Sequence, residues 1–362
     1  MLRTNLNIEN KNLGEDEKQV LISGFERAYG FGVIDEKVFI PDFISGLIYE
    51  LDLRNKKTQI LLKKHDRLDY LNLFEKIRLK LNFKKSIIQP HDIYIDEQSN
   101  FYISEMGPGR KNGKGKILAF DKKFNLIKEI GLEMHNNFGL ISPVMINKLE
   151  EVFYISEFGS NKILRFNNNF EFIDWIGEID QIHSEIKNNS WLPSRHFINI
   201  NLTKPHAIKI GPDKNIYIVD TGNHRILRFG MDGNFKGWIG KRKNGEINDN
   251  WSKDGQSSKG DQLGAFNDPL DLVIKDNFIY LSEVENNRVV KLGLDGKIYG
   301  LLGTNTNKFI WTKDVSMKID LLNPFGLKIV DNTVYIANRG KNEIIAIYSK
   351  NLFINYKNRK KF

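Results

Sequence analysis

The sequence contains no cysteine. Disulfides, zinc fingers, thiolate metal sites and a cysteine nucleophile are therefore excluded, because each of them needs a thiol group. No apolar run approaches the ~20 residues of a membrane span. The polar N-terminus also lacks the apolar stretch of a signal peptide. We therefore expect a cytoplasmic protein with no membrane partner.

Clustered positive charge is also lacking, although the chain is basic. Lysine and arginine number 54 against 45 acidic residues, which gives a net charge of +9. The lysines are scattered, whereas nucleic-acid recognition needs a concentrated basic face with aromatic residues. The densest basic group, "YKNRKKF" at residues 356–362, indicates a solvated tail. Nucleic acid is therefore not an expected partner.

One pattern recurs along the chain. The stretch "LTKPHAIKIGPDKNIYIVDTGNHRILRF" at residues 202–229 reads as three strands separated by turns. Similar stretches begin at Gln89, Ser142, Asp268 and Asn323, and a copy without proline begins at Ala28. A fourth strand often follows, and four short strands per unit are typical of a propeller blade. The sequence therefore predicts an all-β, six-bladed β-propeller with four antiparallel strands in each blade.

The boundaries of the propeller follow from the first and last copies. We expect a single domain over residues 13–357, a polar extension at 1–12 and a basic tail at 358–362. Two segments compete for the outer strand of the last blade, residues 19–25 and residues 352–357. In either case the two termini should meet on one blade.

The second strand of each copy ends in an acidic or amide residue, namely Asp42, Glu105, Glu157, Asp220, Glu283 and Asn338. The segments "DTGNHRILRF" at 220–229 and "GNFKGWIG" at 233–240 resemble the NHL repeat family. The resemblance runs over most of the chain and implies an NHL-type six-bladed propeller. It also implies that these six residues bond within their own blades, so we expect them to be mainly structural.

Long insertions fall on one face of the predicted propeller. They are residues 63–88, 178–204, 241–268 and 304–322, together with the glycine-rich "GPGRKNGKG" at 107–115. Loops of this length in a compact domain usually carry function, so this face is the expected functional face. Within the first insertion, the apolar spacing over 65–83 predicts an amphipathic helix.

The residue after each blade proline begins the innermost strand, at the mouth of the predicted channel. These residues are His91, Val144, His206, Leu270 and Phe325. Imidazole at two equivalent positions can ligate a metal or transfer protons near neutral pH. The alternative is that both rings fill the channel and bond to neighbouring backbone.

The motifs "PHDI" at 90–93 and "PHAI" at 205–208 resemble the metal-binding strands of the peptidyl-hydroxyglycine amidating lyases. The resemblance implies zinc, or another divalent transition metal, held by His91 and His206, and a structural calcium ion held by Asp92. The third zinc ligand of that family would fall on Phe325, which cannot ligate a metal, so an inserted histidine such as His135, His183 or His196 would have to supply it. Gluconolactonase-like propellers use Glu, Asn and Asp at such positions, a set that this chain lacks.

Two functions remain open on the sequence. The first is a lyase or hydrolase acting on a small polar or anionic molecule, with His91 and His206 as catalytic residues and Arg110 and Lys111 binding the substrate. The alternative is a non-catalytic NHL propeller that binds a protein, peptide or glycan on its long-loop face. Exposed aromatic residues on the insertions, such as Trp191, Phe197 and Trp251, would favour the alternative.

Overall fold

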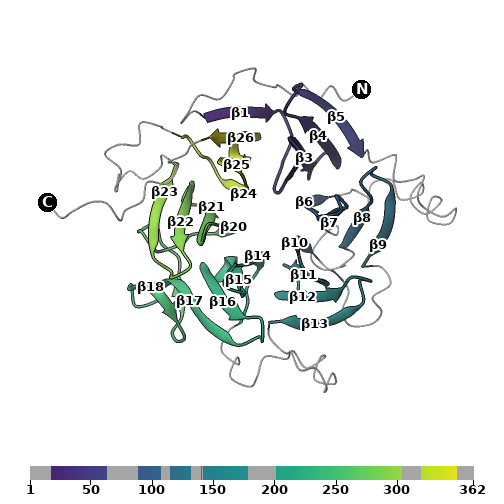
Figure 1. Cartoon of the computed structure of the whole chain (residues 1–362). Helices are drawn as coiled ribbons and strands as arrows, with labels where there is room; N and C mark the ends of the chain where they lie inside the picture. The colour runs from purple at the N-terminus through teal and green to yellow at the C-terminus, as the bar shows by residue number, and fades with distance from the viewer. Residues whose placement is uncertain are drawn as a thin grey trace. The chain divides into compact units, whose positions relative to one another are not determined.

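The chain adopts an all-β propeller fold (Figure 1). The computed structural model describes residues 18–62, 89–106, 115–131, 140, 142–177, 201–303 and 319–348. The chain divides into two compact units, residues 25–192 and residues 1–24 with 193–362. Each unit contains antiparallel sheets in which consecutive strands are neighbours, as in a propeller blade.

The unit of residues 25–192 holds three sheets, each built from four consecutive strands. The first sheet comprises β2 (Gly32–Ile34), β3 (Lys37–Asp42), β4 (Leu47–Asp52) and β5 (Lys57–Leu62). The second comprises β6 (Pro90–Ile95), β7 (Phe101–Glu105), β8 (Lys116–Phe120) and β9 (Leu126–Ile130). The third comprises β10 (Pro143–Leu149), β11 (Val152–Glu157), β12 (Lys162–Asn167) and β13 (Phe172–Ile176).

The other unit also holds three sheets. One begins with β14 (Pro205–Ile210), β15 (Asn215–Asp220), β16 (Arg225–Gly230) and β17 (Phe235–Arg242) and continues into β18 (Ile247–Ser252) and β19 (Ser257–Ser258). The next comprises β20 (Pro269–Lys275), β21 (Phe278–Glu283), β22 (Arg288–Gly293) and β23 (Ile298–Leu302). The last comprises β24 (Pro324–Val330), β25 (Thr333–Asn338), β26 (Glu343–Tyr348) and β1 (Lys18–Ser23).

The N-terminal strand completes the last sheet. β1 pairs antiparallel with β26, and Lys18 lies opposite Ile347. The prediction that the termini meet on one blade is therefore confirmed, and residues 19–25 supply the outer strand. The competing segment, residues 352–357, lies outside the described residues.

The prediction of six four-stranded blades is wrong. In the part of the chain that the structure describes, five sheets, not six, have four strands, and the sheet that begins with β14 has six. The insertion at 241–268 causes the difference, because it folds back on β17 as β18 and β19. Trp251 on β18 fixes this hairpin, since its Nε1 donates to the carbonyl of Leu294 at 2.9 Å.

Helix is almost absent from the described ranges, where only short 3-10 turns such as η4 (Thr221–Asn223) and η5 (Arg339–Lys341) are present. The amphipathic helix expected over 65–83 lies outside those ranges. No helix long and apolar enough to cross a membrane was found among the described residues.

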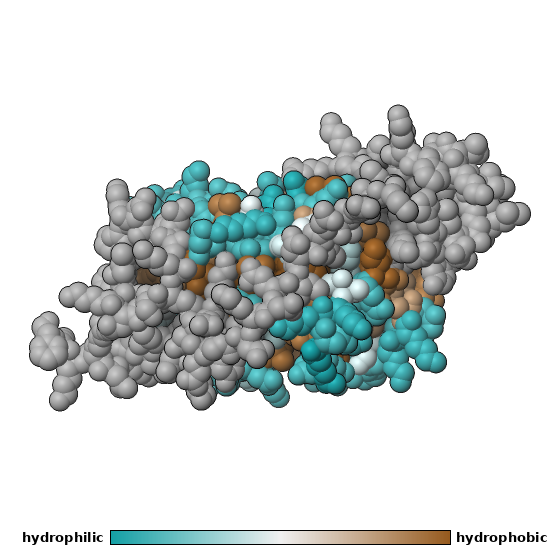
Figure 2. Space-filling view, turned by 90° about the horizontal axis from the view of Figure 1, so that it is seen from above, coloured by the Kyte–Doolittle hydropathy of each residue, from teal (hydrophilic) through white to brown (hydrophobic). Residues whose placement is uncertain are grey.

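The core lies between neighbouring sheets. Trp175 and Trp238, each on the fourth strand of its sheet, are almost fully buried. The first strands pack on one another within each unit, β6 against β10 and β20 against both β14 and β24 (Figure 1). Apolar side chains thus face the neighbouring sheets, and hydrophilic residues dominate the described surface seen in Figure 2. This packing fixes the first strands, which carry the candidate site.

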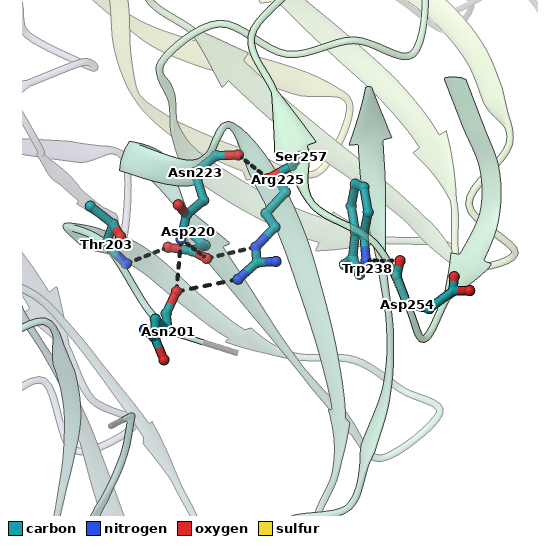
Figure 3. Close-up of polar contacts among 8 residues, drawn as sticks. All are labelled: Asn201, Thr203, Asp220, Asn223, Arg225, Trp238, Asp254 and Ser257. Carbon is teal, nitrogen blue, oxygen red and sulfur yellow. Dashed lines mark hydrogen bonds and ion pairs between the residues drawn. The ribbon is translucent and has the colours of Figure 1, made fainter. Parts of the chain in front are cut away.

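Buried acidic residues at the ends of second strands hold the loops that precede the first strands. Asp220 is fully buried and accepts the backbone N–H of Thr203 at 2.7 Å (Figure 3). It also accepts Asn223 Nδ2 and Arg225 Nε, each at 2.8 Å. Burial raises the pKa of Asp220, and the Arg225 charge and the donated hydrogen bonds oppose the rise. The expectation that this residue bonds within its own blade is confirmed.

The same arrangement recurs in most of the other described sheets. Asp42 accepts the backbone N–H groups of Glu26 and Arg27, and Glu283 accepts those of Asn267 and the side chains of Asn286 and Arg288. In the last sheet an amide replaces the acid, and the charge moves to its partner. There Asn338 Oδ1 accepts the N–H of Leu322, and Nδ2 donates to Glu343 at 2.6 Å.

The residue before a third strand links two neighbouring sheets. Asn287 (φ 50°) accepts the backbone N–H of Asn323 through Oδ1 at 2.7 Å. His224 (φ 53°) takes the equivalent place, and its Nδ1 accepts the N–H of Asp268 at 3.2 Å. Burial lowers the pKa of His224, and the nearby Asp268 charge opposes this. His224 is therefore a structural acceptor that must be unprotonated at Nδ1.

Replacing Asp220 by alanine should lower the free energy of unfolding by about 3–5 kcal/mol, because Arg225 would remain buried without its carboxylate. Asp232→Ala is the matched control, since Asp232 is exposed and bonds only to Asn234 in its turn. The control should lose about 0.5–1.5 kcal/mol. Urea denaturation measures both, and equal losses would contradict the structural role of Asp220.

Replacing His224 by asparagine should make stability less dependent on acid pH. The folded pKa lies below the ordinary value of about 6.5, so below that pH protons bind preferentially to the unfolded chain. The free energy of unfolding of the wild type should be constant above the ordinary histidine pKa. It should decrease as the pH falls from that value toward the lower pKa of His224 in the folded protein. Asparagine does not titrate and keeps an acceptor, as Asn287 does. Urea denaturation between about pH 5 and 8 tests this, and an unchanged acid-side loss would refute it.

Candidate functional site

Each post-proline residue lies at a break in the pairing of its first strand. The register shifts between Pro90 and Asp92 where β6 pairs with β7, and between Pro205 and Ile208 where β14 pairs with β15. Such bulges leave a backbone group unpaired and re-aim the side chain, and they are common beside functional sites. His91 and His206 both lie within these irregular segments.

A serine hydroxyl satisfies the backbone group that the bulge leaves unpaired. Ser104 Oγ accepts the N–H of Asp92 at 3.0 Å and donates to the carbonyl of Val144 at 2.9 Å. In the other unit, Ser282 Oγ accepts the N–H of Asp271 at 3.0 Å and donates to the carbonyl of Phe325. The backbone around each post-proline residue is therefore held by its own sheet and by the next one.

The imidazole of His91 is fixed from two sides. Its Nδ1 lies 3.1 Å from the Val144 carbonyl oxygen. A carbonyl oxygen only accepts, so Nδ1 carries the proton and Nε2 is left with a lone pair in the neutral ring. The ring also stacks on Tyr29 with centroids 4.7 Å apart and an interplanar angle of 12°. Only 4% of His91 is exposed, which suits a pre-oriented proton acceptor.

Tyr29 takes the post-proline position in the first sheet, where Ala28 replaces the proline and bridges to Asp42. Its ring contacts Phe43 edge-on at 4.9 Å, and its hydroxyl accepts Arg27 Nη1 at 3.3 Å. Arg27, Tyr29 and Phe43 are all partly exposed. An aromatic and cationic surface therefore adjoins the buried imidazole of His91.

Asp92 follows His91 and is only 2% exposed. Within the described residues its Oδ1 has no hydrogen-bond partner, although burial of such an oxygen is costly without one. Gly30 lies directly against the carboxylate, and a Cβ on Gly30 would collide with Oδ1. The carboxylate therefore occupies a tight place beside the Tyr29–His91 stack.

His206 belongs to the other unit and has different neighbours. It is 4% exposed, and its ring meets the Phe325 ring at 5.8 Å with an interplanar angle of 76°. The guanidinium of Arg339 lies 5.1 Å from the centroid of Phe325. His91 and His206 therefore belong to different units. Within its own unit, each contacts the aromatic residue at another first-strand start, Tyr29 for His91 and Phe325 for His206.

The described residues do not fit the zinc site that the resemblance implies. No group of three or more metal-ligating side chains occurs among them, whereas zinc takes three or four protein ligands. Phe325 stands where the resemblance puts the third ligand, and its ring contacts His206. The metal roles of His91, His206 and Asp92 stay predictions.

Other predicted site residues fall elsewhere. Arg110 and Lys111, the expected substrate-binding pair, lie outside the described residues, as do Trp191 and Phe197. Trp251 is held by its bond to Leu294 and by the Arg228 guanidinium at 4.5 Å, so it serves the hairpin. Sequence reasoning missed Tyr29 and Arg339. The alignment of Ala28 with the blade prolines is the signal that would have found Tyr29.

Comparisons with known proteins agree with the repeat pattern. Residues 202–229 match the model of the NHL repeat. NHL repeat-containing protein 2 of Gallus gallus is 36% identical over 93 residues, which cover 25% of this chain and 11% of that protein. The chain thus matches about a tenth of the length of this relative. The similarity to NHL repeats is confirmed, and the similarity to amidating lyases stays a prediction.

Several solved structures share the fold at low identity. Virginiamycin B lyase from Staphylococcus aureus is 15% identical with a TM-score of 0.54, over 92% of this chain and 99% of that chain. A gluconolactonase from Xanthomonas campestris is 11% identical with a TM-score of 0.54, over 91% and 89%. An auxiliary nutrient binding protein from Bacteroides thetaiotaomicron is 12% identical with a TM-score of 0.55, over 90% and 70%. At these identities the likeness shows the fold alone.

Ser104→Ala should disturb His91 as well as stability. Loss of the hydroxyl leaves the Asp92 N–H unsatisfied and should lower the free energy of unfolding by about 1–3 kcal/mol. Ser282→Ala is the matched control, because Ser282 makes the equivalent bonds in the other unit. Both variants should be destabilised, but only Ser104→Ala should shift the imidazole nitrogen resonances of His91 in an NMR spectrum. An unshifted His91 would mean that Ser104 does not position it.

Proposed function

We propose that this protein is a lyase or hydrolase of small molecules that uses His91 for proton transfer. The observation that carries the proposal is the fixed imidazole of His91, whose Nδ1–H is bonded to the Val144 carbonyl and whose ring stacks on Tyr29. A general base must be held in one orientation, and the bond of Nδ1 to Val144 with the stack on Tyr29 holds the ring with its lone pair on Nε2. The partly exposed Arg27, Tyr29 and Phe43 would contact the substrate.

The chemistry assigned to Nε2 has two forms. In a hydrolase, Nε2 would take a proton from water as the water oxygen bonds to a carbonyl carbon, and would return it to the oxygen that leaves. In a lyase, Nε2 would take a proton from the carbon beside a carbonyl while the bond to the leaving oxygen breaks and a double bond forms. The imidazolium then returns the proton to that oxygen, so both forms regenerate neutral His91.

Charge and stacking define the expected substrate. The Arg27 guanidinium can pair with a carboxylate or polarise a carbonyl oxygen. The Tyr29 and Phe43 rings offer apolar faces that fit a flat or ring-shaped molecule. We therefore favour a polar or anionic small molecule that contains a carbonyl group. Lactones, which are cyclic esters, belong to this class.

The same aromatic surface also supports a non-catalytic alternative. A partly exposed cluster of Arg27, Tyr29 and Phe43 would suit a ligand that is bound and released unchanged. The shared fold includes the nutrient binding protein as well as the two enzymes. Binding without turnover would therefore favour the alternative, with a small molecule or a peptide as the ligand.

The test is turnover of two probes by wild-type protein and His91→Asn. Gluconolactone hydrolysis is followed by acid release, and virginiamycin B opening by mass spectrometry, in which hydrolysis adds one water and elimination leaves the mass unchanged. We expect wild type to act on at least one probe and His91→Asn to be about 10²–10⁴-fold slower. His224→Asn should keep wild-type turnover, because its imidazole serves only the contact with Asp268.

The outcomes separate the candidates. Turnover that survives in His91→Asn would refute the role of His91. Absence of turnover, with ligand-induced thermal stabilisation that His91→Asn lowers, would establish the binding alternative instead. Repeating the assay after EDTA treatment tests the zinc and calcium prediction, since loss of turnover on chelation and recovery on adding the metal would show a requirement for it.

A further inference from the structure

The strand-ending carboxylate of the first sheet has no basic residue opposite it. In four of the other sheets, the residue paired with the strand-ending acid on the third strand is basic, namely Lys116, Lys162, Arg225 and Arg288. The residue paired with Asp42 is Leu47. Within the described residues the fully buried Asp42 carboxylate meets only backbone donors, the N–H groups of Glu26, Arg27 and Ile44 at 3.0, 2.9 and 3.3 Å. Asp42 therefore fixes the backbone of Arg27 without pairing with its side chain.

The guanidinium of Arg27 has no acidic partner in the described part of the chain. Its one polar contact there is the bond from Nη1 to the Tyr29 hydroxyl at 3.3 Å, and Arg27 is partly exposed. Nη1 lies on the Cδ side of a guanidinium, so this bond leaves the opposite edge, formed by Nε and Nη2, with two parallel N–H donors. Bidentate pairing with a carboxylate uses two parallel donors of this kind.

Two aromatic rings adjoin this guanidinium. Tyr29 bonds to Arg27 through its hydroxyl, and the Phe43 ring meets the Tyr29 ring edge-on at 4.9 Å. The N–H of Phe43 also donates to the carbonyl of Arg27 at 2.8 Å, so the two backbones are joined. The Tyr29 ring stacks in turn on the imidazole of His91. A ligand whose carboxylate pairs with Arg27 would place its body against these rings, beside His91.

We infer that Arg27 selects the ligand of this surface by pairing the Nε–Nη2 edge with a carboxylate on a flat or aromatic body, and that Asp42 positions Arg27. One guanidinium edge offers two donors and a carboxylate has two oxygens, whereas a phosphate presents three. The inference rests on the proposed function, because the same surface is assigned there to the substrate. It narrows the substrate to a carboxylic acid, with the carboxylate separate from the reacting carbonyl.

The experiment is calorimetric titration of the full-length protein with benzoate, benzamide, acetate and phenyl phosphate at low salt. Benzoate should bind about tenfold more tightly than benzamide, which keeps the ring and lacks the charge. It should also bind more tightly than acetate, which keeps the charge and lacks the ring. Tighter binding of phenyl phosphate than of benzoate would contradict the assignment of a carboxylate.

Matched variants separate Arg27 from general charge effects. Arg27→Gln should weaken benzoate binding by about tenfold or more and bring it to the level of benzamide, since a charge-assisted pair is lost. Arg27→Lys should also weaken it, because lysine keeps the charge without the planar fork. Arg54→Gln removes a guanidinium from the same sheet, but Arg54 is exposed and pairs with Glu36, so benzoate affinity should stay within about twofold of wild type.

Asp42→Asn tests the positioning role. The side-chain amide places a donor among three backbone N–H groups, so Arg27 should lose its fixed place and benzoate affinity should fall by about threefold or more. Asp220→Asn is the matched control, because Asp220 is the equivalent residue in the other unit. It should also be destabilised, but should bind benzoate as wild type does at a temperature where both variants are folded. Wild-type affinity in Asp42→Asn would remove Asp42 from the inference.

Two results would overturn the role of Arg27. The first is that wild-type protein binds benzoate no more tightly than benzamide, or binds neither at millimolar concentration. The second is an equal loss of benzoate affinity in Arg27→Gln and Arg54→Gln, which would assign the effect to net charge. Because binding is measured without turnover, a benzoate preference lost in Arg27→Gln stands even if His91→Asn keeps its activity. Turnover that requires His91, without such a preference, would contradict the role of Arg27 alone.

Discussion

The hydrogen bonds between a buried residue at the end of the second strand and the loop before the first strand organise most of the described sheets, through a carboxylate in four of them and through the Asn338 amide in the last. Asp220 joins Thr203, Asn223 and Arg225 through one carboxylate, and the first strand starts two residues after Thr203. A buried charge is tolerated there because several donors surround it. Since the loop is fixed, the residue after the proline is fixed as well. The backbone before His206 is therefore held by Asp220, whereas His91 is held by its bond to the Val144 carbonyl and by its stack on Tyr29.

The recurring elements were predictable from the sequence because they repeat. The proline, the aromatic second strand and its final acid appear in most copies, so their order and bonding followed directly. The pairing of β18 and β19 with β17 was not predictable, because the polar stretch around Trp251 lacks the alternating apolar pattern of a strand. Only the contact of Trp251 with Leu294, a distant residue, shows why this insertion folds onto β17.

The candidate site was predictable only in part. The two histidines stood out because imidazole is rare in this chain and both follow a proline. Tyr29 was missed because Ala28 stands in for the proline, and its stacking on His91 becomes visible only when the sheets are placed side by side. Arg339 was missed because it follows the second strand of its sheet and not a blade proline. An unusual residue in one copy of a repeat is informative at every position, since the other copies define what the fold alone requires.

The pairing of β1 with β26 has a consequence for folding during synthesis. β1 is synthesised before the other described strands, but its partner is the last of them. Until β26 emerges, the apolar residues of β1 have no sheet to join, and an unpaired strand edge is prone to association with other chains. The closing step joins segments that are far apart in the sequence, which makes it slow to form and dependent on β1. Fusions or truncations ahead of residue 24 would therefore act on the final folding step rather than on the preceding sheets.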